Sequence, residues 1–512
     1  MPLNLITDAW IPVRTVEGGR RVVRPDQIAE AGVARPDWPR ADFNLACYEF
    51  LIGLVFLADP PEDETDWEER RAPDPERLCE ALAPLAPAFN LGGPGPRFLQ
   101  DYEELDAAAS PIDMLFIDSS GGNTAKNNAD LMVKRGRYAA LAAPLAAMAL
   151  FTLQSQAPSG GAGNRTSMRG GGPLITLVEP SDEASSPLWD MVWTNVPDGE
   201  SLPPNRLGDA LPWMRKTRTS EKGTTPVQPP DEKGLALAEA FFGMPRRLRL
   251  DFAEDDAGLV IGVRQRPFGT NYGLWRHPLS PYYQQKAGSE LLPVHPKPGI
   301  GSYRNWAGIA FQERDGLRHV ASVVAVWNKR RLSGAKASLH IGGWAMDNMK
   351  PRDFLWSRQP LYPLDPGGER AAVALVQAAN AFALALAGAM QTLTGAASMD
   401  ASIVETAREA FFADTQSDFE AMLGRLSNDE PLATVAPDWV ARLRRVALGL
   451  YDARAVPGLA DRRVVDVQDI VEARGRLLAA FSGWGPKTGQ AAYKALGLTL
   501  PKKRAKKKEP AA

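Results

Sequence analysis

The spacing of apolar residues changes near residue 368 and divides the chain into two parts. Up to that point short apolar runs alternate with polar loops, whereas beyond it apolar residues recur every three or four positions, as on one face of a helix. Four segments show this helical spacing: 368–394, 401–427, 437–453 and 465–482. Pro437 is expected in the first turn of the third helix, where proline is tolerated. The connections are short, so the pattern predicts an antiparallel four-helix bundle.

The N-terminal part mixes helices with strands. Helices are predicted at Asn44–Leu57 and at Ala139–Gln156, where Pro144 marks the first turn or a kink. Strand-like runs lie at 5–13, 174–178 and 320–327, and 338–344 resembles one arm of a hairpin. Residues 199–234 are polar and rich in proline, which predicts a long surface connection.

Together these patterns predict an α+β protein. The expected organisation is a large irregular mixed α/β N-terminal domain over residues 1–365, a C-terminal four-helix bundle over 366–500 and a basic tail over 501–512. A chain of 512 residues is long enough for two or three domains with a large core. The tail is expected to be disordered, because its like charges repel one another and it has almost nothing apolar to bury.

Charge and cysteine content narrow the possible classes of protein. The formal net charge is −2, so contact with nucleic acid must come from local basic patches and not from an overall positive field. The two cysteines, Cys47 and Cys79, and the absence of a secretory signal favour free thiols in a reducing cytoplasm. None of the four histidines is paired with a cysteine at a zinc-binding spacing, so neither a metal nor a cofactor is expected.

Residues 371–393 are free of charge over a length that could span a bilayer. The segment is mostly alanine, however, and it contains Gln377, Asn380 and Gln391, so its hydrophobicity is weak. A buried helix of the bundle explains this composition better than a membrane span.

The most unusual segment is glycine-rich and covers residues 157–173. Six of its 17 residues are glycine, and Arg165 and Arg169 lie between the glycine groups. Glycine allows a backbone to approach another molecule closely and to adopt positive φ angles. Exposed N–H groups together with two guanidinium groups would suit a phosphate or the edge of a base. The sequence matches neither a P-loop nor a dinucleotide-binding fingerprint, and a flexible surface loop would have the same composition.

A second candidate segment, residues 264–278, is rich in arginine and aromatic residues. Arg264 and Arg266 alternate with polar and aromatic side chains here, a mixture that favours nucleic acid. In the alternative interpretation, the segment is a loop bounded by proline that packs Trp275 into the core while its arginines are solvated.

A third candidate segment, residues 342–352, begins with a glycine pair. Polar residues that include Asp347, Asn348 and Lys350 follow, flanked by methionines. Such a segment could form a hairpin tip that inserts between base pairs. An ordinary hairpin with a basic exposed face would have the same sequence features.

Motifs of common enzyme classes are missing from the sequence. It contains neither a Gly-x-Ser-x-Gly elbow nor a His-Glu-x-x-His helix. Carboxylates are plentiful, as in Glu62–Glu64, but they fall in charged, solvated runs. We therefore assign no catalytic residue and expect no enzymatic activity.

Several short motifs, taken in their order along the chain, resemble the large subunit of Cascade from type I-E CRISPR systems, a family often called CasA. They are Asn4–Val13, Gln156–Pro158 with the glycine segment that ends in Arg169-Gly170-Gly171, Gly273–Pro278 with Ser280-Pro281, and Gly342–Trp344. Each motif is modest alone, and their order and separation over most of the chain make the combination specific. Members of the family are similar in having an irregular α/β domain followed by a four-helix bundle.

The resemblance implies that the chain recognises the protospacer-adjacent motif (PAM) of duplex DNA from the minor groove. Matching within each motif places Gly160, Gly161, Ala162 and Gly163 in the family's glycine loop, Arg266 at its basic finger, and Asn348, with Asp347 beside it, at its hairpin wedge. The same matching places Lys126, Asn127 and Asn128 in a loop that contacts the 5′ handle of the guide RNA or a neighbouring subunit. In the best-known member a glycine, a lysine and a glutamine stand at the positions of Ala162, Arg266 and Asn348, so the preference among PAMs could differ.

The implied function is that of a non-catalytic subunit that recognises the PAM, initiates strand separation for R-loop formation and helps to recruit the effector helicase–nuclease. The implied partners are double-stranded target DNA, the 5′ handle of the CRISPR RNA, the other Cascade subunits and that helicase–nuclease. Minor-groove edges distinguish mainly A·T from G·C pairs, which suits a permissive reader. The alternative is an architectural cap that holds the 5′ handle without reading DNA.

Overall fold

The computed structural model describes residues 2–119, 126–127, 136–161, 163–181, 187–221, 224–297, 301–312, 317–330, 337–393, 401–485 and 487–501. The candidate residues Asn128 and Ala162, and the basic tail beyond Pro501, lie outside the described residues. The chain forms two compact units, Met1–Pro298 with Arg314–Leu361 and Gly299–Glu313 with Tyr362–Ala512. The spacing of apolar residues did not indicate that Gly299–Glu313 belongs with the second unit.

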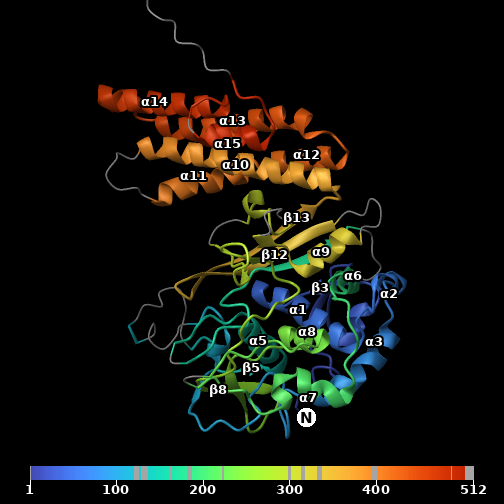
Figure 1. The fold of residues 1–512 in the computed structure, drawn as a ribbon. Helices are drawn as coiled ribbons and strands as arrows, with labels where there is room; N and C mark the ends of the chain where they lie inside the picture. Colours follow the sequence, from blue (N-terminus) through green and yellow to red (C-terminus); the bar gives the residue numbers. More distant parts are fainter. Residues whose placement is uncertain are drawn as a thin grey trace, which may run out of the picture. The chain divides into compact units, whose positions relative to one another are not determined.

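The first unit combines helices with small antiparallel sheets (Figure 1). Its α-helices are α1 (Ala41–Ala58), α2 (Glu64–Glu69), α3 (Pro75–Leu82), α5 (Ala143–Gln156), α6 (Pro187–Thr194), α7 (Leu207–Ala210), α8 (Lys233–Phe241) and α9 (Ser322–Lys329). Its strands are β1 (Ile11–Thr15), β2 (Arg20–Val23), β3 (Val33–Pro36), β4 (Ala109–Pro111), β5 (Leu141–Ala142), β6 (Ile175–Pro180), β7 (Arg247–Phe252), β8 (Leu259–Arg266), β9 (Tyr282–Tyr283), β10 (Leu292–Pro293), β11 (Arg318–His319), β12 (Ala337–Asp347) and β13 (Lys350–Leu361). The strand orders are β2-β1-β3, β10-β9-β11, β13-β12-β6 and β4-β8-β5, and β7 also pairs with β8. This mixture confirms the predicted α+β class.

Helix α1 lies in the core of the first unit because apolar side chains cover most of its surface. Phe50 of α1 packs edge to face against Phe151 of α5, with ring centroids 5.4 Å apart, and against Phe242, 6.1 Å away. Helix α1 and the C-terminal helix α10 (Pro366–Leu393) are long and apolar enough to cross a membrane by length and composition. In their apolar windows 83% and 61% of the residues are buried, so packing against protein accounts for this composition.

Some local predictions for the first unit are confirmed and others are wrong. Helices α1 and α5 occur where they were predicted, and Pro144 lies at the start of α5. The run 320–327 is not a strand but largely the helix α9, because Val323, Val324 and Trp327 are buried together at helical spacing. Tertiary burial here overrides the weak helix propensity of valine.

Two further predictions for the first unit need correction. The strand predicted at 5–13 begins only at Ile11, where β1 starts. The segment 199–234 is not simply a surface connection, because it contains α7 and the fully buried Trp213. The indole N–H of Trp213 donates a hydrogen bond to the carbonyl oxygen of Ala88 at 2.6 Å, which ties this segment to the core.

The hairpin of β12 and β13 has a two-residue turn at Asn348 and Met349. Trp344 faces Phe354 across the hairpin, and Asp347 faces Lys350 next to the turn. The φ angles of Asn348 and Met349 are 48° and 61°. Positive φ at both positions gives the turn a twist that matches the twist of the flanking strands.

The second unit is helical, as predicted, but its helices divide differently. They are α10 (Pro366–Leu393), α11 (Ala401–Asp414), α12 (Gln416–Ser427), α13 (Leu432–Ala455), α14 (Val464–Phe481) and α15 (Lys487–Ala495). The predicted helix 401–427 is broken at Thr415, whose hydroxyl donates to the carbonyl oxygen of Phe411 at 2.6 Å. Pro437 lies inside α13 and not in its first turn, because α13 begins at Leu432. Helix α15 was not predicted.

Helix α10 packs against α11, α13, α14 and α15 (Figure 1). Phe382 of α10 stacks on Phe481 of α14, with ring centroids 4.1 Å apart. The indole N–H of Trp439 in α13 donates to the carbonyl oxygen of Leu375 at 3.0 Å. The uncharged stretch noted in the sequence is therefore the shared core of this unit.

Candidate nucleic-acid interface

The three candidate segments of the sequence meet in the first unit. The backbone N–H of Phe268, in the second segment, donates to the carbonyl oxygen of Gly163, in the glycine segment, at 2.9 Å. A Cβ atom added to Gly171 would lie 3.4 Å from the sulfur of Met349 at the hairpin turn. Residues more than 100 positions apart thus lie next to one another in the described structure.

The glycine segment is closed by its own backbone hydrogen bonds. The N–H of Gly172 donates to the carbonyl oxygen of Gln156 at 2.9 Å, so the two ends of the segment are held together. Inside it, Ser167 N–H donates to Ala157 at 2.9 Å and Asn164 N–H donates to Gly161 at 2.8 Å. These hydrogen bonds favour a compact loop of fixed shape over a flexible connection.

The glycines of this loop serve two different purposes. Gly172 has a φ of +64°, and a Cβ there would overlap the backbone oxygen of Trp344 in β12. At Gly163 a Cβ would lie 2.8 Å from the ring of Phe268. Gly160 and Gly161, in contrast, are exposed, and a Cβ on Gly161 would meet no atom within 4 Å. Gly160 also allows close packing, because a Cβ there would lie 2.8 Å from the Cβ of Asn164, and only Gly161 of these four has open space for another molecule.

Arg246 holds the glycine loop in place, a role that the sequence pattern does not reveal. Its guanidinium donates to the carbonyl oxygen of Pro158 at 2.5 Å and to that of Arg165 at 2.9 Å. Burial lowers the pKa of Arg246 to about 10, which still leaves it charged at neutral pH. Nothing in the local sequence marks this residue, because its partners come from a segment more than 80 positions away.

Arg165, a predicted DNA contact, is partly engaged within the protein. Its Nε donates to the hydroxyl of Ser220 at 2.7 Å, and one terminal nitrogen donates to the carbonyl oxygen of Ser220 at 2.9 Å. The side chain is half-buried. Arg165 therefore links the loop to the segment around Ser220 and leaves only part of its guanidinium accessible.

Arg169 does not lie on the surface, contrary to the prediction that it contacts DNA. Only 3% of the residue is exposed. Its guanidinium donates to Glu49 Oε1 at 2.5 Å and to the hydroxyl of Ser280 at 3.1 Å. A buried charge must be paired to remain in the interior. Arg169 therefore anchors the end of the glycine loop to helix α1.

Two histidines, the buried His277 and the exposed His295, complete this anchor. His277 Nε2 lies 3.4 Å from Glu49 Oε1. Burial lowers the pKa of His277 well below its ordinary value, and the charge of Arg169 lowers it further, so His277 is neutral. A ring nitrogen of His295 contacts the backbone oxygen of Arg169 at 3.0 Å. The loop end is fixed both by the side chain and by the backbone of Arg169.

Arg264 and Arg266 lie on β8 with their guanidinium groups partly open to solvent. Their side chains are 44% and 45% exposed. Arg264 pairs with Asp251 at 2.8 Å, and Arg266 is 3.5 Å from Asp106. Trp275 is buried, as the alternative interpretation of this segment expected, and it donates to the carbonyl oxygen of Val227 at 2.7 Å. The segment thus combines a packed aromatic residue with accessible arginines.

The tip of the β12–β13 hairpin is exposed at every position from Asp347 to Lys350. The carboxylate of Asp347 accepts hydrogen bonds from Arg352 at 2.9 Å and from the side chain of Asn348 at 3.0 Å. Met349 is exposed as well and gives the tip an apolar face. The tip can therefore present an amide, a thioether and an ammonium group to a partner.

The remaining candidates and the cysteines add little to this geometry. Lys126 and Asn127 are exposed. Cys47 is a buried free thiol and Cys79 an exposed one. Over the described ranges, no group of three or more His, Cys, Asp or Glu side chains is placed to hold a metal ion.

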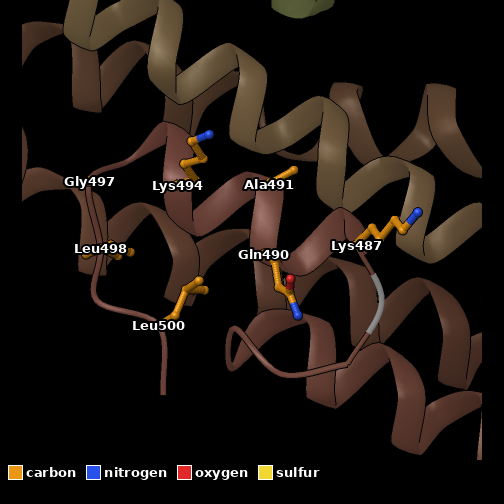
Figure 2. Close-up of a pocket in the computed structure, with 7 residues that line it drawn as sticks. All are labelled: Lys487, Gln490, Ala491, Lys494, Gly497, Leu498 and Leu500. Atoms are coloured by element: carbon orange, nitrogen blue, oxygen red, sulfur yellow. The ribbon is translucent and has the colours of Figure 1, made fainter. Parts of the chain in front are cut away.

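A pocket of about 540 Å³ lies in the second unit, on α15 and the segment that follows it (Figure 2). Its lining residues are Lys487, Gln490, Ala491, Lys494, Gly497, Leu498 and Leu500. None of them belongs to the three candidate segments. The candidate interface is thus marked by converging surface segments and not by this pocket.

Comparison with known proteins identifies the family. The family model of the CRISPR-associated protein Cse1 matches residues 4–450. Thermobifida fusca Cse1 has a similar fold, with a TM-score of 0.69, 17% identity and coverage of 97% of this chain and 98% of that chain. For Thermus thermophilus CasA (Cse1) the TM-score is 0.66 at 17% identity, with 97% and 99% covered. A chain of a CRISPR RNA-guided surveillance complex gives 0.68 at 15% identity, with 93% and 99% covered. The family model spans most of the sequence, and the chain therefore belongs to the Cse1 family of CRISPR-associated proteins.

Proposed function

We propose that this protein is the large, non-catalytic subunit of a type I-E Cascade complex, and that it recognises the PAM of duplex target DNA and begins strand separation. The observation that carries the proposal is the convergence of three segments. The exposed glycines 160–161, the arginines of β8 and the hairpin tip belong to segments that are joined by the hydrogen bond between Phe268 and Gly163 and by the proximity of Gly171 to Met349.

Each element suits a different part of the task. The open backbone at Gly161 can approach the floor of the minor groove without a side chain in the way. Arg266 supplies positive charge for the DNA backbone or for the groove edge. Asn348 and Met349 stand at the tip of the hairpin, where insertion must offset a few kcal/mol of unstacking for each base step. Arg165 contributes charge with the part of its guanidinium that remains accessible.

Further partners follow from the same assignment. The loop with Lys126, Asn127 and Asn128 contacts the 5′ handle of the guide RNA or a neighbouring Cascade subunit. Asp347 and Lys350 accompany Asn348 at the wedge, and Arg264 accompanies Arg266. Guide pairing supplies the sequence specificity, and the complete R-loop then recruits the effector helicase–nuclease in the cytoplasm.

The decisive experiment reverses the charge of Arg266 in the assembled complex. We expect Arg266→Glu to abolish binding to a PAM-containing duplex in a gel-shift assay at fixed salt, because the like charge repels the DNA backbone. Arg20→Glu is the matched control, since Arg20 is also an exposed strand arginine that pairs with an aspartate, Asp37, at 2.7 Å. Equal affinities of the Arg266 variant and the wild type would contradict the proposal.

The wedge role of Asn348 can be separated from its role in the turn. Asn348→Gly removes the side chain but accepts the positive φ of 48°, whereas Asn348→Ala also strains the turn. If the amide acts as a wedge, Asn348→Gly slows R-loop opening more than it weakens initial PAM contact. Equal effects on both steps would remove the wedge assignment. Crosslinks of residues 160–169 to RNA alone, without any to duplex DNA, would instead favour an architectural cap.

A further inference from the structure

Four arginines stand on one face of the β7–β8 ribbon. Arg247 lies directly opposite Arg266, and Arg249 lies directly opposite Arg264. Residues opposite one another in an antiparallel pair, and residues two apart on a strand, project from the same face. We call these four residues the arginine ladder.

An acidic segment, Asp101–Ala107, crosses the face of this ribbon, and we call it the acidic strap. At its start, the N–H of Asp101 donates to the carbonyl oxygen of Leu248 on β7 at 2.9 Å. After its end, β4 pairs with β8, with Ala109 opposite Arg264. Because β7 already occupies one edge of β8 at this point, β4 lies on the other edge. The strap must therefore pass over the ribbon from one side to the other.

Carboxylates of the acidic strap form ion pairs with three of the four arginines of the ladder. Asp101 pairs with Arg247 at 2.6 Å, and Glu104 pairs with Arg249. Asp106 lies 3.5 Å from Arg266. The fourth member, Arg264, is neutralised by Asp251 on the ribbon itself at 2.8 Å. Every arginine of the ladder thus faces a carboxylate, and the ladder offers little net positive field.

The ion pairs of the strap differ in solvent exposure from one end to the other. The side chain of Asp101 is fully buried, and that of Arg247 is 19% exposed. At the other end, Asp106 is fully exposed and Arg266 is 45% exposed. Glu104 is also largely exposed, although Arg249 beneath it is buried. Asp106 can leave Arg266 at little cost, because exposed ion pairs are weak. Glu104 can leave Arg249 only when another anion takes its place, because the guanidinium of Arg249 is buried.

We propose that the acidic strap is an electrostatic competitor for nucleic acid, whose outer carboxylates occupy the arginine ladder until backbone phosphates replace them. This inference rests on the proposed function and deepens it. A guanidinium binds a carboxylate and a phosphate through the same planar arrangement of donors. While Glu104 and Asp106 remain in place, a duplex without a PAM gains little from the ladder, because attraction by the phosphate backbone is the source of non-specific affinity.

The test neutralises the outer carboxylates without changing their size. Asp106→Asn is combined with Glu104→Gln in the full chain, assembled with the other Cascade subunits, and binding to a duplex that lacks a PAM is measured at several salt concentrations. We expect binding to tighten by roughly two- to fivefold for each carboxylate removed, the range set by exposed ion pairs. The log–log slope of affinity against salt concentration steepens by about 0.9 for each additional phosphate that the ladder neutralises.

The control variant carries Glu68→Gln and Glu80→Gln, which remove the same charge from exposed positions of α2 and α3. We expect it to bind the PAM-free duplex as the wild type does. The inference is overturned if the strap variant binds no tighter than the wild type, or if the control tightens binding equally, since a change in overall charge would then suffice.

Failure of this inference can be told apart from failure of the proposed function. The proposed function fails if the wild-type complex binds duplexes with and without a PAM equally well. The strap is judged on a different comparison, namely the strap variant against the control variant on the PAM-free duplex alone. A loss of stability is checked by thermal unfolding of both variants, and the buried anchors Asp101 and Leu105 are left unchanged.

Discussion

At the scale of single residues, buried charge determines how the glycine loop is held. Glu49 lies in the middle of an otherwise apolar helix, and Arg169 reaches it from the end of the loop. Each of these charges would be costly in the interior without the other. The pair therefore joins the core of the first unit to the segment that we assign to DNA.

Removing one partner of this pair tests how strongly the anchor contributes to the stability of the fold. We expect Glu49→Gln to lower the free energy of unfolding by about 3–5 kcal/mol, because the charge of Arg169 stays buried without compensation. Urea unfolding of the full chain at neutral pH measures the change. The control is Asp466→Asn, which breaks an exposed pair with Arg463 at 2.7 Å and should leave stability unchanged. A Glu49 variant as stable as the wild type would show that Arg169 finds another partner.

A second residue-scale prediction concerns pH. Burial alone would raise the pKa of Glu179, but hydrogen bonds and charge from His340 at 3.0 Å and Arg358 at 2.6 Å outweigh burial and lower it. A lowered carboxyl pKa contributes stability that is present above the unfolded value and is lost as pH falls through the folded value.

We therefore expect Glu179→Gln to be less stable than the wild type at about pH 6, with a difference that shrinks below about pH 4. Urea unfolding of both proteins at the two pH values measures this difference. Glu80→Gln, an exposed change in α3, serves as the control and should show no such trend. If the difference in the free energy of unfolding between Glu179→Gln and the wild type stayed constant with pH, ionisation of Glu179 would not contribute to stability.

At the scale of elements, the glycine loop and the hairpin are fitted to one another. Gly161 and Gly172 have nearly the same φ, +65° and +64°, but different surroundings. An alanine at either position incurs the cost of a left-handed conformation, about 1–2 kcal/mol. At Gly172 it would also overlap the backbone of Trp344, and overpacking adds about 1–3 kcal/mol.

The matched pair Gly161→Ala and Gly172→Ala therefore separates packing from binding. We expect Gly172→Ala to lower the free energy of unfolding more than Gly161→Ala does, as measured by urea unfolding. Gly161→Ala should instead weaken binding of the assembled complex to a PAM-containing duplex while the fold is kept. If the two variants were equally stable, the close fit between Gly172 and the hairpin would not constrain the fold.

At the scale of the whole molecule, the chain builds each unit from discontinuous segments. In the sequence, Gly299–Glu313 lies between two parts of the first unit, but in the structure it belongs to the second unit. Within that second unit, Tyr303 stacks on Phe419 with ring centroids 4.2 Å apart, and its hydroxyl lies 2.7 Å from the hydroxyl of Thr415. Tyr303 thus meets the helices at the break between α11 and α12.

Tyr303 should therefore stabilise a helical unit that lies far from it in the sequence. We expect Tyr303→Ala to lower the free energy of unfolding of this unit by about 3–5 kcal/mol through lost packing. Tyr303→Phe, which removes only the hydroxyl, should cost about 1 kcal/mol. Tryptophan fluorescence follows the transition, since Trp439 lies 5.9 Å from the ring of Tyr303. Equal losses for both variants would assign the effect to the hydrogen bond alone.

Much of the local structure was predictable from the sequence because it depends on nearby residues. The largely apolar run of α1, the three- and four-residue spacing of the C-terminal helices and the hairpin arm at Ser338–Trp344 were all visible in the sequence. The helix at α9 was not, because valine favours strands unless tertiary burial decides otherwise. The break at Thr415 depends on partners that the local pattern does not contain.

The candidate site was predictable only in part. By itself, the sequence determined the family, from the order of motifs along the chain, and the α+β class, from the spacing of apolar residues; it also supplied the three segments that we propose for DNA binding. Only the tertiary structure decided what the individual arginines do. Arg266 stays on the surface, 3.5 Å from Asp106. Arg169 is buried against Glu49, and Arg246 holds the glycine loop. A guanidinium has the same chemistry in each of these places, and its role depends on burial and on partners that are distant in sequence and meet only when the chain folds.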